Sequence, residues 1–380
     1  MKVLNVNIIL DLVAGGGTAE RTYQMSRALH QKGIGCTLLT TDIGLTKKRV
    51  ASLDGVEVIA LPTINKRFYI PWISFLRFRK IIYNADVIHL MNHWTLLNAI
   101  VYLFVRKYNK PYVVCPAGTL FSNERSRILK KMYNAVVGKN IIRNADRSIA
   151  ISVDEIKQFE EYGVSQDKLV HLPNGVKMED YIVDGDNKIL SQHGIRDIPY
   201  VLFVGRLNYI KGPDILLQAF CDVSRMFPDV HLVFVGPDEG ELAKLKRITE
   251  SSGIKERVHF LGYLEGEEKA RIYKRAEILV IPSRQEMMSI VVLEAGIVGT
   301  PVILTDRCGF NEVEKIGGGI VVPASVAGIK EGLIKMLFKP EETQAAGENL
   351  KNHVLQNYTW EVLIERYLRM YEEIISYRKN

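Results

Sequence analysis

The sequence predicts an α/β protein built from two doubly wound domains, each with a parallel β-sheet. Short apolar runs rich in β-branched residues alternate with helical stretches, a pattern typical of parallel sheets. The alternation stops in a polar, turn-rich stretch at 180–197 and then restarts. The 380 residues exceed one ordinary core and suit two domains of about 150–200 residues. We therefore assign Rossmann-like domains to 1–183 and 184–358, and expect a binding cleft between their carboxyl edges.

The first domain begins with a strand at 1–10, a glycine loop at Gly15-Gly16-Gly17 and a helix that ends near Leu29. Consecutive glycines let the backbone approach a ligand closely. Their spacing differs from the G-x-G-x-x-G fingerprint of dinucleotide sites, so we do not predict an NAD site. Further strands are predicted at 35–40, 56–61, 87–91, 112–115, 148–151 and 169–172, the last followed by a Pro-Asn-Gly turn.

The second domain repeats the alternation. Its strands are predicted at 200–204, 231–235, 258–263, 276–281 and 301–304, with helices at 214–226 and 290–298. The last segment, 359–380, carries apolar residues at helical spacing. Because an amphipathic helix needs a surface to cover, we expect this segment to pack back on the first domain.

Two glutamates mark the stretch 282–294, around which the second domain is organised. Glu286 follows the buried strand 276–281, at the strand end where open α/β sheets bind ligands. Glu294 lies about one turn into the next helix. Because a carboxylate can accept hydrogen bonds from both hydroxyls of a vicinal diol, each glutamate can hold one sugar ring. The plainer interpretation is a strand-loop-helix unit with two solvated acids.

Groups suited to phosphate lie around these glutamates. Ser289 is a predicted N-cap, so the N–H groups of Ser289, Ile290 and Val291 form an anion site at the helix start. Arg206 and Lys211 follow the first strand of this domain and offer a planar fork of donors and a point charge for two phosphates. Either cation alone is typical of a solvated loop, but with the glutamates they form a set.

Composition is typical of a soluble globular protein, with 47% apolar and 24% charged residues. Four scattered cysteines without a C-x-x-C pair indicate a reducing compartment and no metal or disulfide framework. We interpret the polar-interrupted start as a strand rather than a signal peptide. The longest apolar run, 96–105, is far shorter than the ~20 residues that a membrane span needs. We therefore expect a cytoplasmic protein that does not cross a membrane.

Positive charge is concentrated in the first half of the chain. Residues 1–183 contain 25 Lys and Arg against 15 Asp and Glu, a net charge of +10, whereas the remainder has a net charge of −3. The segment 66–143 alone has a net charge of +12. Such an asymmetry predicts an anionic partner for the first domain.

Aromatic residues are interleaved with cations at 66–80. A helix starting at Pro71 would carry an apolar face that includes Trp72; the flanking cations are Lys66, Arg67, Arg77 and Lys80. Such a helix suits the inner face of an anionic membrane, where each cation contributes about 1 kcal/mol. The alternative is a core helix with a solvated basic face. The concentrated positive charge favours the membrane-surface interpretation over this alternative. No segment resembles a nucleic-acid-reading module, so we predict no nucleic-acid partner.

Short motifs run through nearly the whole chain in the order of a known family. They are Gly15-Gly16-Gly17 with Glu20, Leu172-Pro173-Asn174-Gly175-Val176, Val204-Gly205-Arg206-Leu207 with Lys211-Gly212, Gly236-Pro237-Asp238, Phe260-Leu261-Gly262, the pair Glu286 and Glu294, Gly299-Thr300-Pro301-Val302 and Tyr358-Thr359-Trp360. Together they resemble the retaining glycosyltransferases of family 4 (glycosyl transferases group 1), which have the GT-B fold.

The resemblance implies a role for each site residue. Arg206 and Lys211 would clamp the diphosphate of a UDP- or GDP-linked sugar and offset the charge of the leaving group. Glu286 would bind the transferred sugar and Glu294 the ribose, with the base near Gly262 and Tyr263. Further donor contacts are expected from Gly16, Gly17, Met288, Ser289, Ile290 and Val291. In such enzymes a donor phosphate oxygen deprotonates the acceptor hydroxyl in a front-face displacement, so we expect no protein nucleophile, no metal and no cofactor.

Two departures from the family pattern concern the sugar pocket. Many relatives carry a histidine, usually in contact with the sugar, after the strand at 112–115, where this chain has Ala117. His89 and His93, from the preceding strand, are candidates to replace it or to face the acceptor, although a packed imidazole is the simpler interpretation of each. Relatives also have glycine and an aromatic residue after the first glutamate, where Met287 and Met288 predict a more apolar pocket.

We therefore predict an enzyme that transfers a sugar from a nucleotide-diphosphate sugar to an acceptor hydroxyl with retention of configuration. The predicted acceptor is a lipid-linked saccharide at the inner face of a bacterial membrane. The pathway would be the biosynthesis of a surface polysaccharide: O-antigen of lipopolysaccharide, capsule or exopolysaccharide. A nucleotide-sugar epimerase of the same fold and a non-catalytic nucleotide-sugar-binding subunit are the alternatives.

Overall fold

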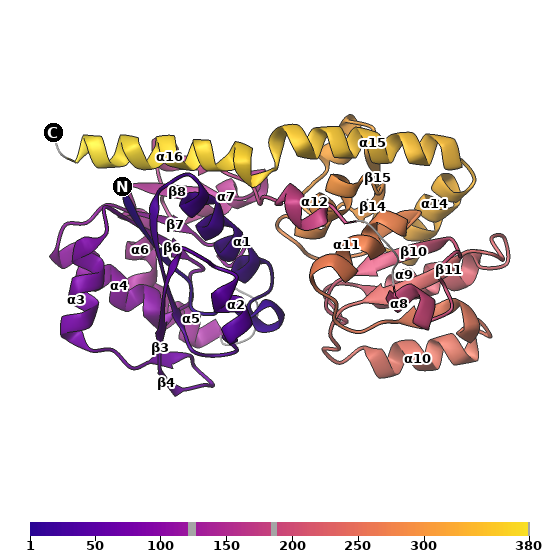
Figure 1. Cartoon of the computed structure of the whole chain (residues 1–380), viewed down its shortest axis with the longest axis horizontal. Coiled ribbons are helices and arrows are strands. Elements are labelled where there is room, and N and C mark those ends of the chain that lie inside the picture. The colour runs from indigo at the N-terminus through magenta and orange to yellow at the C-terminus, as the bar shows by residue number, and fades with distance from the viewer. Residues whose placement is uncertain (121–126, 184–187, 379–380) are drawn as a thin grey trace. The chain divides into compact units, whose positions relative to one another are not determined.

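A computed structural model describes residues 1–120, 127–183 and 188–378 (Figure 1). The chain forms two compact units: unit 1 is Met1–Gly175 with Trp360–Asn380, and unit 2 is Val176–Thr359. The first domain segment ends at Gly175, before the predicted boundary at residue 183. The reason is that Val176 already pairs with unit 2, where its N–H donates to the Tyr358 carbonyl at 2.9 Å. The predicted linker includes 184–187, which lie outside the described residues.

Unit 1 is organised around a seven-stranded parallel sheet in the order β3-β2-β1-β6-β7-β8-β9. Its strands are β1 (Lys2–Val6), β2 (Gly35–Thr41), β3 (Glu57–Leu61), β6 (Val87–Met91), β7 (Tyr112–Cys115), β8 (Arg147–Ala150) and β9 (Leu169–His171). Its helices are α1 (Leu12–Gln31), α2 (Lys47–Ala51), α3 (Phe75–Asn84), α4 (Leu96–Lys107), α5 (Arg127–Tyr133), α6 (Lys139–Arg143), α7 (Val153–Glu161) and α16 (Trp360–Tyr377), with a π-helical turn at Asn134–Gly138 and a 3-10 turn at Gln166–Lys168. All five residues of β6 and all four of β7 are buried, as expected for central strands with helices on both faces.

Helix α1 begins before the three glycines rather than after them. Asp11 is its N-cap and accepts a hydrogen bond from the Ala14 N–H at 2.7 Å. Gly16, with φ 53° and ψ −141°, interrupts the helical backbone in a region that other residues rarely adopt. The predicted glycine loop is therefore a break inside a helix.

The predicted helix start at Pro71 is wrong. Thr63–Asn65 (β4) and Ile70–Pro71 (β5) pair as an antiparallel hairpin, and the Trp72 N–H donates to the Pro62 carbonyl at 2.7 Å. These hydrogen bonds keep the backbone extended, so α3 begins only after its N-cap, Ser74. Of the apolar residues of α3, only Phe78 and Ile82 are buried.

Helix α16 belongs to unit 1 and packs against α1 (Figure 1). Arg21 of α1, only 2% exposed, joins this helix to the Pro-Asn-Gly turn. Its guanidinium donates to the Leu172 and Pro173 carbonyls at 2.9 and 2.8 Å, and to the hydroxyl of Tyr367 in α16. This buried arginine thus holds together three segments that are distant in sequence.

Unit 2 contains a six-stranded parallel sheet in the order β12-β11-β10-β13-β14-β15. Its strands are β10 (Tyr200–Val204), β11 (His231–Val235), β12 (Val258–Phe260), β13 (Ile278–Ile281), β14 (Val302–Thr305) and β15 (Gly319–Val322). Its helices are α8 (Lys188–Gln192), α9 (Pro213–Val223), α10 (Leu242–Ser251), α11 (Gly266–Arg275), α12 (Ile290–Val298), α13 (Glu312–Lys315), α14 (Val326–Leu337) and α15 (Pro340–Asn357), with 3-10 turns at Met178–Tyr181 and Lys255–Arg257. Within the described residues, no helix has the length and apolar character that a membrane crossing requires.

Candidate functional site

The strand order of unit 2 reverses between β10 and β13, because β11 and β12 lie on one side and β14 and β15 on the other. The carboxyl ends of these two strands form the switch point at which doubly wound sheets bind ligands. The loop after β10 carries Arg206 and Lys211, and the loop after β13 carries Glu286. The structure thus brings the three predicted catalytic residues to one edge of one sheet.

Lys211 and Glu286 form an ion pair across these two loops. The Lys211 Nζ lies 2.8 Å from the Glu286 Oε1, and the side chains are 26% and 9% exposed. The hydroxyl of Ser283 also donates to Glu286. Burial alone would raise the pKa of Glu286, but the Lys211 ammonium and hydrogen bonds from Lys211, Ser283 and Ser289 outweigh burial and lower this pKa below its ordinary value. Glu286 is therefore an ionised, hydrogen-bond-accepting carboxylate at neutral pH.

Arg206 is held by an acidic residue that the sequence reasoning did not identify. Its guanidinium lies 3.1 Å from Glu239, in the loop after β11, and Asn208 donates to the same carboxylate at 2.7 Å. The Arg206 side chain is 42% exposed, so it can reach a ligand. Both candidate phosphate-binding cations therefore form ion pairs with carboxylates, Arg206 with Glu239 and Lys211 with Glu286.

Arg284 connects the two switch-point loops. It forms a bidentate ion pair with Asp214 of α9, with both N–O distances 2.9 Å. Its guanidinium lies 3.9 Å from the centre of the Tyr209 ring. Its backbone N–H donates to the Ile210 carbonyl at 2.8 Å. This pair fixes the loop that carries Glu286 against the loop that carries Lys211, and sequence reasoning missed it because its members are far apart in the chain.

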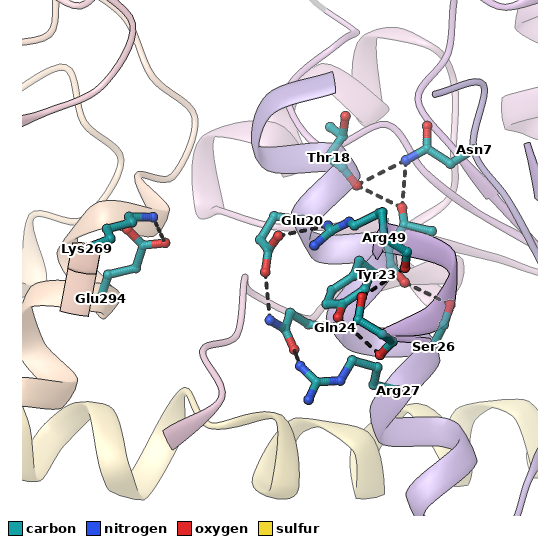
Figure 2. A network of polar contacts seen from close by, with 12 residues as sticks. Asn7, Thr18, Glu20, Tyr23, Gln24, Ser26, Arg27, Arg49, Lys269 and Glu294 are labelled. Atoms are coloured by element: carbon teal, nitrogen blue, oxygen red, sulfur yellow. Dashed lines mark hydrogen bonds and ion pairs between the residues drawn. The ribbon is translucent and has the colours of Figure 1, made fainter. Parts of the chain in front are cut away.

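Glu294 lies on α12, as predicted, but it is 4% exposed and already bound on both oxygens. Lys269 of α11 contacts one oxygen at 2.7 Å, and the Tyr273 hydroxyl donates to the other at 2.6 Å (Figure 2 shows the lysine). Burial would raise the pKa of Glu294, but Lys269, Tyr273 and Tyr181 lower it. A carboxylate has further lone pairs, so a ribose contact from Glu294 stays a prediction.

The remaining predicted donor contacts of unit 2 lie on the same strand ends. Ser289 is the N-cap of α12, but its hydroxyl makes no cap bond, and the helix starts with Ile290 and Val291. Met288 is buried, whereas Tyr263 is 41% exposed. At Gly262 the φ is 73°, and a side chain there would meet no atom within 4 Å. There is therefore open space beside Gly262. Its carbonyl accepts a hydrogen bond from the Gly236 N–H at 2.7 Å, which places Gly262 next to the loop that carries Glu239.

Unit 1 places Gly16 and Gly17 in α1, with Gly17 exposed. Glu20, the acidic member of the same motif, serves the fold of unit 1. Its carboxylate pairs with Arg49 at 3.0 Å and accepts from Gln24 at 2.7 Å (Figure 2). Glu20 thus anchors α1 to the segment that includes α2.

Neither His89 nor His93 lies on an exposed acceptor or membrane face, so that expectation is wrong for both. His89 is fully buried with its Nδ1 2.7 Å from the Tyr371 hydroxyl, and burial lowers its pKa to about 3. His93 is 1% exposed and bonds Asn134 at 2.9 Å, and burial lowers its pKa to about 4. Both are neutral packed imidazoles, the simpler of the two sequence interpretations.

The loop that lacks the family histidine is held in an unusual conformation. Ala117 has φ 51°, in the left-handed region that favours glycine. The buried Glu155 supports this loop by accepting from the Gly118 N–H at 2.6 Å and the Ile151 N–H at 2.8 Å. The Glu155 carboxylate therefore fixes the backbone at this strand end together with the Thr119 hydroxyl, which donates to the Pro116 carbonyl at 2.7 Å.

The predicted membrane-facing residues cluster on the β4–β5 hairpin and α3, which we call the α3 surface. Its large apolar members are strongly exposed, with Trp72 57%, Phe75 53% and Leu76 74% exposed. Its cations Lys66, Arg67, Arg77 and Lys80 are also exposed. Most solvent-facing helices hide such side chains, so an exposed apolar patch among cations indicates an interaction surface.

Comparison with solved structures defines the class of fold. The chain is similar to the Anabaena protein HepE in complex with UDP and glucose, with a TM-score of 0.80 and 18% identity over 98% of this chain and 100% of that one. At this identity the likeness concerns the fold alone. With two Rossmann-like units, the protein has the GT-B fold of glycosyltransferases, as predicted.

Sequence comparison gives the family. A model described as Glycosyltransferase Family 4 matches residues 15–180, and one described as Glycosyl transferases group 1 matches residues 186–353. A D-inositol 3-phosphate glycosyltransferase of Corynebacterium jeikeium is 27% identical over 84% of this chain and 80% of that protein. An uncharacterized glycosyltransferase of Methanocaldococcus jannaschii is 25% identical over 94% of each chain. The chain belongs to glycosyltransferase family 4 and is a transferase, which confirms the predicted family.

Proposed function

We propose that this glycosyltransferase takes a UDP- or GDP-linked sugar as donor and transfers the sugar, with retention of configuration, to a hydroxyl of a lipid-linked saccharide in surface-polysaccharide assembly. The observation that carries the proposal is the switch point of unit 2, where Arg206 and Lys211 lie on one edge with the ionised Glu286. The UDP and glucose named for the HepE structure support a nucleotide-sugar donor.

Each group has a task in the proposed reaction. An entering diphosphate draws Lys211 and Arg206 from their glutamates, and Glu286 then accepts hydrogen bonds from the hydroxyls of the sugar. The acceptor oxygen forms a bond to the anomeric carbon on the face from which the phosphate leaves. The bond between that carbon and the phosphate oxygen breaks, and the acceptor proton passes to the departing diphosphate. The two cations stabilise the charge that develops on the leaving group, so the proposal includes no protein nucleophile and no metal.

Donor binding is the first test. A panel of nucleotide sugars is added to the chain and to Lys211→Ala, and the melting temperature is measured, because a ligand that binds the folded state raises it. We expect a UDP- or GDP-sugar to raise the melting temperature of the wild type and to have little effect on Lys211→Ala. The matched control is Lys330→Ala, an exposed lysine of the same unit. An equal response of all three chains would contradict the assignment of Lys211.

Turnover is the second test. With the donor found by binding, we expect Glu286→Ala to lose sugar transfer while keeping nucleotide binding, because Glu286 contacts the sugar. Wild-type turnover in this variant removes Glu286 from the mechanism. The anomeric configuration of the product, read by NMR, decides between retention and inversion, and full activity in a chelator is expected if no metal takes part.

We further propose that the α3 surface binds the inner face of an anionic membrane and thereby brings the enzyme to its lipid-linked acceptor. Exposed aromatic rings suit the headgroup region, and the cations suit anionic lipids. Sedimentation with vesicles of phosphatidylcholine, with and without phosphatidylglycerol, tests this at low and high salt. Binding should require phosphatidylglycerol and weaken as salt rises; indifference to lipid charge would refute the proposal.

A further inference from the structure

A groove of about 500 Å³ lies in unit 1 between α3 and the amino ends of three strands. Its lining includes Lys2, Gly35 and Glu57, the first residues of β1, β2 and β3. In unit 1 the strand order reverses between β1 and β6, and Asn92 donates to Asn7 at 2.9 Å beyond their carboxyl ends. Because these strands are parallel, the groove opens at the opposite edge of the sheet from the switch point, and it is a separate site.

The groove combines an apolar floor with a positive rim. Leu4, Cys36 and Ile59 form part of the floor and are 1%, 5% and 7% exposed. Three cations line it, namely Lys2, Arg77 and Lys80, against a single acid, Glu57, which accepts from the Thr37 hydroxyl at 2.8 Å. Among the described residues, none of these three cationic side chains has a carboxylate partner. The groove is therefore suited to a ligand with a negative group and an apolar part.

The groove and the α3 surface share one helix. Phe78 and Ile82 of α3 point into the core of unit 1, and Arg77, Lys80 and Ile81 line the groove. Leu76 of the same helix is 74% exposed. A membrane that meets the exposed apolar side chains of α3 would thus bring lipid headgroups beside the unpaired cations.

We propose that this groove binds the phosphate-bearing headgroup of an anionic membrane phospholipid. The Arg77 guanidinium and the lysine ammonium groups donate charge-assisted hydrogen bonds to the phosphate, and the glycerol and first acyl carbons lie on the apolar floor. The volume is in the range of small-molecule sites, roughly 300–1,000 Å³. The inference rests on the proposed membrane attachment and adds to it a defined lipid site.

Short-chain lipids separate this site from general attraction to a membrane. Calorimetric titration uses dihexanoyl phosphatidylglycerol, dihexanoyl phosphatidylcholine and inorganic phosphate as probes. We expect the wild type to bind the phosphatidylglycerol most tightly, because only this probe has both a net negative headgroup and an apolar part. Equal affinity for inorganic phosphate would overturn the lipid assignment and indicate a site for free phosphate.

Two variants test the groove itself. Arg77→Gln/Lys80→Gln removes two cations, and we expect dihexanoyl phosphatidylglycerol to bind about 25-fold more weakly, at about fivefold per cation. Asn84→Trp fills the groove without changing its charge and should also weaken binding. The matched control is Lys139→Gln/Lys157→Gln, which removes two exposed cations of unit 1 outside the groove. Wild-type affinity in both groove variants would overturn the proposal.

A further variant distinguishes a failure of the lipid site in the groove from a failure of membrane attachment through the α3 surface. Leu76→Ser should reduce vesicle binding but keep binding of the short-chain lipid. If the groove variants bind normally and only Leu76→Ser loses vesicles, the membrane surface stands and the lipid site is wrong.

Discussion

The ion pair between Arg284 and Asp214 offers the sharpest test of how the donor site is held in place. The perturbation is Arg284→Met, Asp214→Asn and the double variant. The side chains are 24% and 9% exposed, so the pair lies between a surface pair worth up to about 1 kcal/mol and a buried pair whose disruption costs about 3–5 kcal/mol. We expect each single variant to lose about 2–3 kcal/mol of unfolding free energy. At about 2–4 °C per kcal/mol for a domain of this size, the melting temperature should fall by about 4–12 °C.

The same variants should lower turnover, because Arg284 joins the loop of Glu286 to the loop of Lys211. Misplacement of a catalytic loop by about 1 Å can cost about 100-fold in rate, so we expect kcat/KM to fall toward that extent. Thermal unfolding and steady-state kinetics are measured together. The control is the exposed pair Lys330 and Asp222, whose removal should cost under about 1 kcal/mol. A coupling energy below about 0.5 kcal/mol in the double-mutant cycle, or unchanged kcat/KM in Arg284→Met, would refute the reasoning.

Three further predictions concern other contacts. Arg21→Lys keeps the charge but cannot reproduce all the buried hydrogen bonds of the guanidinium, so it should lower the free energy of unfolding by about 3 kcal/mol. An unchanged melting temperature would contradict the role of Arg21 in holding these segments together. Gly212→Ala should lose stability and turnover because the added Cβ would lie 2.1 Å from the Pro282 carbonyl oxygen. The control is Gly194→Ala, which has a similar φ but open space around the Cβ, so it should lose only the stability that backbone strain costs. Because the pKa of Glu286 is lowered in the folded chain, the unfolded chain takes up this proton first as pH falls. The stability that ionised Glu286 contributes is therefore present above about pH 4.3, the pKa of an unfolded glutamate, and is lost as pH falls through the folded pKa. Urea unfolding of Glu286→Gln should accordingly show a free energy that depends less on acid pH than that of the wild type.

Much of the fold is readable from local pattern. The strands at 87–91, 112–115, 200–204 and 231–235 and the helix at 290–298 are predicted with the boundaries that the structure shows. Each of these strands is mostly apolar, with His89 inside the strand at 87–91 and His231 at the start of the strand at 231–235. The helix has Ser289 before it and Gly299 after it. Such signals lie within a few residues of one another, so the sequence reveals them directly.

The errors arise where distant contacts override local pattern. The aromatic residues near Pro71 suit a helix, but pairing with 63–65 makes the backbone extended there. His89 and His93 look available in the sequence and are buried by neighbouring elements, His89 against α16. Strand β15 is not among the predicted strands, although Ile320, Val321 and Val322 favour a strand; it is only four residues long and follows glycines, and its pairing with β14 places it in the sheet.

By itself, the sequence determined the two parallel sheets, the strand ends that carry Arg206, Lys211 and Glu286, and the family. The tertiary structure alone decided which charges meet: Lys211 with Glu286, Arg206 with Glu239, Arg284 with Asp214 and Lys269 with Glu294. The groove beside α3 also exists only in the folded chain. The physical reason is range, because secondary structure follows from contacts between near neighbours, whereas ion pairs and cavities depend on segments that only the packed sheet brings together.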